Sequence, residues 1–271
     1  MTLNEWLCEW LDIYKVPYLT RGSVERLEGV IRLHVPAWLK ELQLEDIRAL
    51  DVDRAIAACK AARTRKYLYF TLRNALRKAY CVDLIPHDIT QKIESVRYRA
   101  KTGRALTVTE QAQFLERAKD CKYINLFKFY LLTGARRAEA LSLKWSDIDY
   151  SLKQIHISGT KTECSDRIVY ILPELAAALE EQYKLTGTGV LVFPYNKTNV
   201  SHTFHRLCPD HCLHDLRHTF VTRCAESGIN VNVAQQLAGH SDISTTLKIY
   251  THITTEFSKT EFAKFRLTPK D

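Results

Sequence analysis

The sequence predicts a mainly α-helical protein with a small antiparallel β-sheet, organised as a helical first domain and a mixed α+β second domain. Apolar residues recur at helical spacing along most of the 271 residues. Two short segments, 154–158 and 167–171, instead alternate apolar and polar residues as strands do, with a polar connection between them. The stretch VRYRAKTGRA at 96–105 contains four basic residues and no acidic one, which is typical of an exposed linker. The expected divisions are a helical domain at 1–97, a basic linker at 98–105 and the second domain at 106–271.

Residues 3–95 are expected to be helical. The segment 4–14 places large apolar side chains at helical spacing. Ser23 is a suitable N-cap for a helix that ends before Pro36. Two more helices are expected over 51–62 and 64–80.

The helix that ends near Tyr80 has two unlike faces. Between Lys60 and Lys78 there are seven basic residues and no acidic one. The apolar face consists of Leu68, Leu72, Ala75 and Ala79, and the basic face of Arg63, Lys66, Phe70, Arg73 and Arg77. A solvated surface is the simpler explanation, but such surfaces usually mix signs, so a contact with the DNA backbone is the sharper hypothesis. The residues expected to contact DNA are Arg63, Lys66, Arg73, Arg77, Arg97, Arg99 and Lys101.

The second domain is expected to mix helices with the two strands. Thr107 and Glu110 form a capping box for a helix that runs to residue 118. Pro173 suits the first turn of a helix to residue 184, and Gly239 suits a helix C-cap. The other expected helices span 123–132, which should be buried, 136–143, 200–207, 214–226, 231–238 and 254–267.

Composition excludes two classes of protein. No apolar run approaches the roughly 18 residues that cross a bilayer. The start, MTLNEWLCEW, has no basic region and carries early acidic residues, so it is not a signal peptide. We therefore expect a cytoplasmic protein, with its eight cysteines reduced and mostly buried. The net charge of +8 favours a polyanionic partner, though weakly.

Cofactor and metal sites find little support. The sequence contains no glycine-rich phosphate loop and no G-x-S-x-G turn. The segment HRLCPDHCLHDLRH at 205–218 offers the residue types that bind zinc. However, Cys208 and Cys212 are four apart, no second distant pair exists, and Pro209 interrupts the segment. We expect no metal and no cofactor.

Several charged residues suit a phosphate site. Arg136 opens a helix, where anions are favoured, and Glu139 lies three residues on, where it could hold the guanidinium. Lys161 lies in the polar connection GTKT between the strands. His214 and Arg217 are three apart and should project from one helix face.

Two further residues complete this set. His240 follows Gly239 at a helix end, and Tyr250 lies ten residues further. Each residue alone has a simpler explanation, such as an ion pair, an exposed lysine or a half-buried tyrosine. Together, two Arg, one Lys and two His make a strong site for a phosphodiester, and a tyrosine beside them could attack it.

The second domain resembles the catalytic domain of the tyrosine recombinase (phage integrase) family. The matching segments, in order, are TGARRAEALSLKWSDID at 133–149, GTKT at 159–162, HDLRHTF at 214–220 and LAGHSDISTTLKIYTH at 237–252. The first domain is similar to the family's helical core-binding (SAM-like) domain, through 5–15 and 32–51. The resemblance is greatest to integrases of phages and conjugative transposons. The resemblance does not include the N-terminal arm-binding domain that many of these integrases carry, which implies that the chain is an integrase of a simpler type or part of a longer protein.

The resemblance implies a role for each matched residue. Arg136 and Arg217 match the two arginines that clamp the scissile phosphate. Lys161 matches the lysine that protonates the leaving oxygen. His214 matches a phosphate contact that transfers protons, His240 a position held by His or Trp, and Tyr250 the nucleophile. Positive charge around the tyrosine should favour its phenolate, and this chemistry needs no metal.

The implied function is a site-specific recombinase that cuts and rejoins DNA through a 3′-phosphotyrosyl intermediate, integrating or excising a mobile element. Its implied partners are double-stranded DNA with inverted-repeat core sites, three further copies of the chain in a tetramer on DNA, and accessory DNA-bending or directionality factors. The alternatives are a type IB topoisomerase, a DNA-binding protein with an inactive site and a zinc-binding module.

Overall fold

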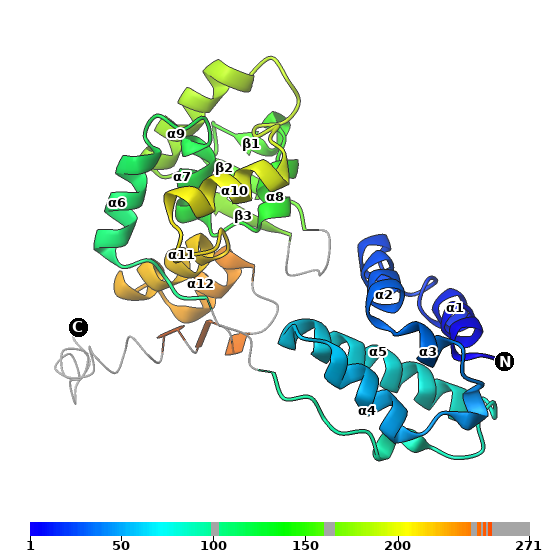
Figure 1. Ribbon diagram of the computed structural model, residues 1–271. Coiled ribbons are helices and arrows are strands. Elements are labelled where there is room, and N and C mark those ends of the chain that lie inside the picture. The colour runs from blue at the N-terminus through cyan, green and yellow to red at the C-terminus, as the bar shows by residue number, and fades with distance from the viewer. Residues whose placement is uncertain (99–102, 160–165, 240–242, 245, 248, 251–271) are drawn as a thin grey trace, which may run out of the picture. The chain divides into compact units, whose positions relative to one another are not determined.

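The computed structural model describes residues 1–98, 103–159, 166–239, 243–244, 246–247 and 249–250. Some predicted features lie outside these ranges, namely Arg99, Lys101, Lys161, Cys164, His240 and the helix at 254–267. The chain forms two compact units, residues 1–101 and 102–271 (Figure 1). Each unit has a hydrophobic core of its own.

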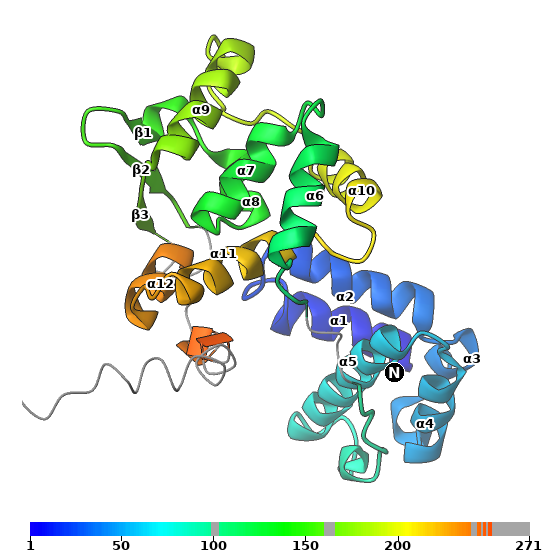
Figure 2. The ribbon, with the colours of Figure 1, turned by 90° about the vertical axis from the view of Figure 1, so that its left-hand side faces the viewer.

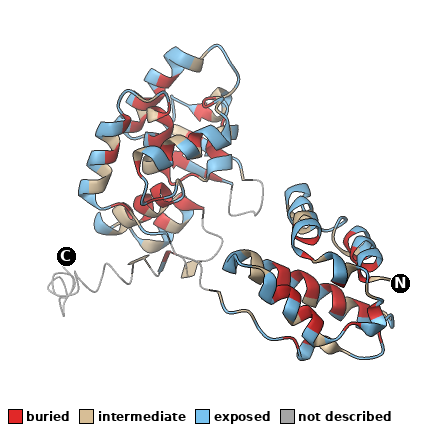
Figure 3. Ribbon diagram, viewed as in Figure 1, coloured by how far each residue is buried: buried red, intermediate tan, exposed pale blue. Residues whose placement is uncertain are grey.

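The first unit is a helical bundle organised around its longest helix, α5. The helices are α1 (Leu3–Tyr14), α2 (Arg21–His34), α3 (Ala37–Lys40), α4 (Ala49–Ala58) and α5 (Ala62–Cys81), with 3₁₀ turns at Leu44–Asp46 and Ile89–Gln91. α5 packs against α1, α2 and α4. Its predicted apolar face, Leu68, Leu72, Ala75 and Ala79, is completely buried (Figure 3).

α1 is held at its start and along its apolar side. The Thr2 hydroxyl accepts a hydrogen bond from the Glu5 amide, and the Glu5 carboxylate accepts one from the Thr2 amide at 2.8 Å. Trp6 is buried, and its indole N–H donates to the Ala75 carbonyl of α5 at 2.9 Å. This bond satisfies the polar end of a buried aromatic ring and fixes α1 against α5.

The predicted start of α2 at Ser23 was wrong. The helix begins at Arg21, and Thr20, with an extended backbone, is its N-cap. Ser23 lies inside the first turn, where its hydroxyl hydrogen-bonds with that of Thr20 at 3.0 Å. The first turn contains no apolar residue before Val24, so the apolar pattern starts later than the helix does.

The second unit packs helices around the apolar helix α7 (Ile124–Thr133) (Figure 2). α7 is buried between α9 and α11, as its apolar sequence predicts. The other helices are α6 (Val108–Ala118), α8 (Arg137–Ser142), α9 (Pro173–Thr186), α10 (Lys197–Leu207), α11 (Asp215–Glu226) and α12 (Val231–Ala238), with a 3₁₀ turn at Trp145–Asp147. The capping box of Thr107 and Glu110, Pro173 in the first turn of α9 and the left-handed Gly239 after α12 are all confirmed.

A three-stranded antiparallel sheet covers one side of this unit. Its order is β1 (Ile148–Asp149), β2 (Gln154–Ile157) and β3 (Arg167–Tyr170). Ile155 pairs with Val169, and both are buried, so one face of the sheet joins the core. β1 was not predicted because two residues are too few to show a strand alternation.

The expectation that the cysteines are mostly buried was wrong for the described residues. Only Cys208 and Cys224 are buried, whereas Cys8, Cys81 and Cys212 are exposed. Cys8 lies on the outer side of α1 and Cys81 at the end of α5, so both remain open to solvent.

A membrane-spanning helix needs both length and an apolar surface, and none of the helices in the described part of the chain has enough of both.

Candidate active site

The candidate site begins at the turn between α7 and α8. Gly134 follows α7 in the left-handed conformation, with φ of 63°, and its amide donates to the Tyr130 carbonyl at 2.9 Å. A Cβ at this position would lie 2.4 Å from Cδ1 of Phe220, so only glycine fits. The turn directs the chain to Arg136, the N-cap of α8.

Arg136 is held by Glu139, as the sequence suggested. The Arg136 Nη1 donates to Glu139 Oε1 at 2.7 Å, and the Arg136 amide donates to Glu139 Oε2 at 2.8 Å. The other guanidinium nitrogen, Nη2, donates to the Gly239 carbonyl at 2.6 Å. The Arg136 side chain keeps 35% of its surface exposed, so its guanidinium remains accessible to a ligand while Glu139 and Gly239 hold it in place.

Arg167 is a member of this cluster that sequence reasoning missed. Its side chain is 5% exposed, and its Nη2 donates to Glu139 Oε2 at 3.0 Å. Burial raises the pKa of Glu139, but the contacts with Arg167 and Arg136 outweigh it and hold that pKa below its usual range. No local pattern predicts this pair, because the two residues are 28 positions apart.

Arg217 lies in α11 and is 2% exposed. Its Nη1 donates to the Gly134 carbonyl at 2.8 Å, which ties α11 to the turn that leads into Arg136. Burial, followed by the charges of Arg136 and Arg167, lowers the pKa of Arg217 to about 9. The guanidinium therefore remains charged at neutral pH, close to two others.

His214 is the N-cap residue of α11 rather than a residue of its first turn. It retains exposed surface, and its ring lies edge-on to His218, with centroids 5.0 Å apart. Desolvation, followed by the nearby His218 and Arg217, lowers the pKa of His214 to about 4. The imidazole is thus neutral at pH 7.

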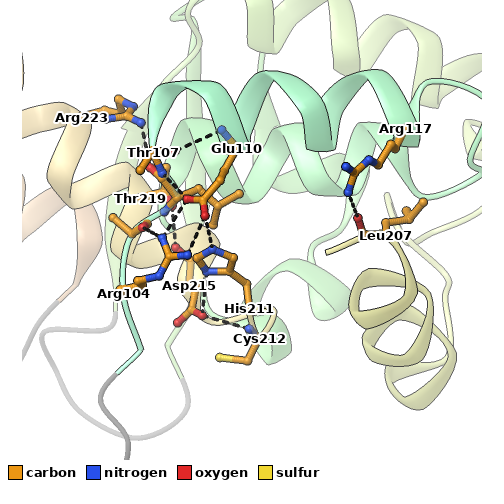
Figure 4. Close-up of polar contacts among 12 residues, drawn as sticks. Arg104, Thr107, Glu110, Arg117, Leu207, His211, Cys212, Asp215, Thr219 and Arg223 are labelled. Atoms are coloured by element: carbon orange, nitrogen blue, oxygen red, sulfur yellow. Dashed lines mark hydrogen bonds and ion pairs between the residues drawn. The ribbon is translucent and has the colours of Figure 1, made fainter. Parts of the chain in front are cut away.

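A polar network fixes the start of α11 (Figure 4). Arg104 forms a bidentate pair with Glu110, at 2.8 and 2.6 Å. The buried ring of His211 lies between Glu110, at 3.6 Å, and Asp215, at 3.3 Å. Asp215 Oδ2 also accepts from the Cys212 amide at 2.9 Å. These contacts anchor the residues on both sides of His214.

Tyr250 is half-buried and packs beside the cluster of Phe220, Val221 and Cys224. Its hydroxyl donates to the Ile229 carbonyl at 2.9 Å. Burial, followed by the Cys224 thiol, raises the pKa of Tyr250 to about 12. The expectation that positive charge favours its phenolate is therefore wrong for the arrangement seen here, because the phenol is desolvated and its hydroxyl donates a hydrogen bond to a carbonyl.

The remaining predicted residues belong to the first unit or lie outside the described ranges. Lys161 and His240 are outside them, although Gly239, next to His240, contacts Arg136. In the first unit Arg63, Arg77 and Arg97 are exposed, and Lys66 and Arg73 are partly exposed. Among the described residues, no group of three His, Cys, Asp or Glu side chains could hold a metal ion.

Comparison with known sequences gives consistent matches. Residues 109–256 match the phage integrase family. The tyrosine recombinase XerC of Pediococcus pentosaceus is 27% identical over 284 residues, covering 95% of this chain and 89% of that protein. The tyrosine recombinase XerA of Saccharolobus solfataricus is 32% identical over 170 residues, covering 61% of this chain and 58% of that protein.

Comparison with solved structures shows a shared fold. The Tn1549 transposon integrase in complex with a circular intermediate DNA superposes with a TM-score of 0.79 at 19% identity, covering 97% of this chain and 99% of that one. A lambda integrase dimer bound to a core site gives 0.78 at 20% identity, covering 92% and 95%. A lambda integrase tetramer bound to a Holliday junction gives 0.74 at 21% identity, covering 89% and 78%.

Proposed function

The chain belongs to the phage integrase family and is a tyrosine-type site-specific recombinase, an enzyme that cleaves and rejoins DNA; from this premise we propose which residues carry the reaction. Arg136 and Arg217 bind the nonbridging oxygens of the scissile phosphate. The observation that supports this most is that Arg217 bonds to Gly134, two residues before Arg136. Two guanidiniums so placed can stabilise the charge that develops on a phosphodiester under attack.

Tyr250 is the nucleophile. To react, its hydroxyl must exchange the Ile229 carbonyl for the phosphate. The phenol oxygen then bonds to phosphorus as the bond to the 5′-oxygen breaks, which leaves a 3′-phosphotyrosyl link and a 5′-hydroxyl. Attack by another 5′-hydroxyl reverses the step and releases the tyrosine, so the strand is rejoined without an external energy source.

Proton transfer falls to Lys161 and His214. Lys161 protonates the departing 5′-oxygen, which as an alkoxide would leave poorly. His214 accepts the phenol proton, for which a neutral imidazole is required, and its lowered pKa supports that state. His240 is a further phosphate contact.

Both units contact the DNA. In the first unit, Arg63, Lys66, Arg73 and Arg77 form the basic face of α5, opposite the face that is buried. Two aromatic rings lie among these cations, with Arg63 over Tyr67 and Lys66 over Phe70, both 5.9 Å from the ring centroid. Arg97, Arg99 and Lys101 follow along the linker. These contacts are to phosphates, so they provide affinity rather than sequence readout.

On DNA, four copies of the chain assemble on two inverted-repeat core sites. The assembly integrates or excises a mobile element in the cytoplasm of a bacterial or archaeal host, and accessory DNA-bending or directionality factors assist it. The lambda integrase dimer on a core site and tetramer on a Holliday junction support this stoichiometry by analogy. The alternative is relaxation of DNA by a single copy, as in type IB topoisomerases. Relaxation of a plasmid that lacks the core sites would favour that alternative.

The test of the chemistry uses a core-site duplex taken from the inverted repeats in DNA flanking the gene. In one version the 5′-bridging oxygen at the cleavage point is replaced by sulfur, which leaves as a thiolate without protonation. Lys161→Ala should cleave the oxygen substrate about 10²–10⁴-fold more slowly than the wild type but the sulfur substrate at nearly the wild-type rate. Tyr250→Phe should form no covalent product with either. Equal slowing of Lys161→Ala on both substrates would contradict the acid role.

A further inference from the structure

Arg167 connects three segments of the second unit that lie far apart in the sequence. It is the first residue of β3, and it is almost completely buried. Its Nε donates to the Leu237 carbonyl at the end of α12 at 2.7 Å, and its Nη2 donates to Glu139 of α8 at 3.0 Å. Its Nη1 lies so near Gly239 that a Cβ there would approach it to 2.8 Å.

These contacts close a ring around Arg136. Glu139 Oε2 accepts from both Arg167 and the Arg136 amide, while Oε1 accepts from the Arg136 guanidinium. Arg136 in turn donates to the Gly239 carbonyl, two residues beyond the carbonyl that Arg167 binds. The position of Arg136 therefore depends on two groups, Glu139 and the turn at Gly239, and Arg167 holds both.

We infer that Arg167 is a positioning residue for strand cleavage, which sets the direction of the Arg136 guanidinium and the place of the turn that leads into His240. The inference rests on the proposed role of Arg136 at the scissile phosphate. The competing explanation is that Arg167 only neutralises the buried Glu139 carboxylate. The two differ in what a lysine could do at this position, since one ammonium supplies the charge but cannot reproduce a guanidinium fork that spans Glu139 and Leu237.

The first experiment compares cleavage of the core-site duplex by Arg167→Lys, Arg167→Ala and the wild type under single-turnover conditions. Both variants should cleave about 10²-fold more slowly, as expected when a catalytic group is displaced by about 1 Å, with DNA affinity changed much less. Arg223→Ala is the matched control, because Arg223 also pairs with a carboxylate, that of Glu226, and with a carbonyl, that of Leu106. This variant should cleave DNA at the wild-type rate. A wild-type rate for Arg167→Lys would overturn the inference and favour charge neutralisation.

The second experiment tests coupling. Arg136→Lys should itself lower the cleavage rate, because it gives up the fork that contacts Glu139 and Gly239. If Arg167 acts through Arg136, adding Arg167→Lys should lower the rate little further. Losses that multiply would show that the two residues act independently and would overturn the inference.

The third measurement needs no DNA. Hydrogen exchange at the Arg136 amide, which donates to Glu139, should become faster in Arg167→Lys, while amides in the middle of α7 remain protected. Exchange at Arg136 that is unchanged would count against the inference, and so would loss of protection throughout the unit, which would mean a purely structural role. If Tyr250→Phe still forms covalent product, the proposed function fails instead, so the two failures are distinguishable.

Discussion

Gly134→Ala should damage both the stability of the second unit and its catalysis. Gly134 has a φ of 63°, and its missing side chain leaves room for the Phe220 ring, whose Cδ1 would lie 2.4 Å from an added Cβ. Phe220 is itself buried against α12 and cannot move without disturbing that contact. The Gly134 carbonyl also accepts from Arg217, so a shift of the turn moves an arginine of the site.

The size of the effect follows from two terms. A residue with a Cβ in the left-handed region costs roughly 1–2 kcal/mol relative to glycine. Displacing a packed aromatic ring adds about 1–3 kcal/mol, as overpacking does elsewhere. The free energy of unfolding should therefore fall by about 2–5 kcal/mol. If the Gly134 carbonyl moves by about 1 Å, cleavage should slow by about 10²-fold as well.

Gly228→Ala is the matched control. Gly228 has a φ of 71°, but no described atom lies within 4 Å of a Cβ placed there. This variant should lose only the roughly 1–2 kcal/mol backbone term and should cleave DNA normally. Urea unfolding followed by hydrogen-exchange mass spectrometry reports the second unit separately from the first. If the two variants lose the same stability and cleave alike, the reasoning from the Phe220 contact is refuted.

Four further outcomes are expected. Arg73→Ala combined with Arg77→Ala should lower the slope of log K against log salt by about 0.9 for each phosphate that is no longer bound, measured by DNA-binding titrations at several salt concentrations. Deletion of residues 255–271 should spare binding to a single core site but abolish recombination, assayed by gel shift and by product formation. Gly29→Ala, inside α2 with open space around it, should raise the free energy of unfolding by roughly 0.5–1 kcal/mol. His214→Asn should make stability less dependent on pH between about 4 and 6.5. The folded state lowers the pKa of His214 to about 4, so the contribution of this histidine to the free energy of unfolding is complete above about 6.5 and is lost as pH falls toward 4.

Two of these outcomes have a matched control variant. Replacement of Arg21 and Lys40, which lie on other elements of the first unit, should leave the salt slope unchanged. An unaltered slope after the α5 changes would restore the solvated-surface explanation of that face. Unchanged recombination by the truncated chain would exclude a role for the tail in assembly. His202→Asn, an exposed histidine of α10, should keep the wild-type pH dependence of stability, and an equal change in both variants would contradict the assignment to His214.

Features set by local chemistry could be predicted from the sequence. The capping box at Thr107, the proline that begins α9 and the glycine that ends α12 each depend on neighbours within four residues. The two faces of α5 follow from residue spacing alone. The pair of Arg136 with Glu139 also belongs here, because one helical turn brings the two side chains together.

Features set by distant parts of the chain could not be predicted. Arg167 meets Glu139 and Leu237 only because β3, α8 and α12 converge, and no spacing rule connects them. The neutral state of His214 depends on burial and on charges brought by packing. The same holds for Tyr250, whose hydroxyl partner is a carbonyl 21 residues away. The start of α2 was misplaced for a different reason, since the helix has no apolar residue before Val24.

The network at the start of α11 gives the linker a mechanical connection to the active site. Gly103, within the linker, lies so close to Asp215 that a Cβ there would be 2.0 Å from Oδ1, and the next residue, Arg104, is paired with Glu110 of α6. A force along the linker therefore acts on the first turns of both α6 and α11. His214 is the N-cap of α11 and Arg217 lies in its first turn, so strain in the linker would reach two residues of the proposed site.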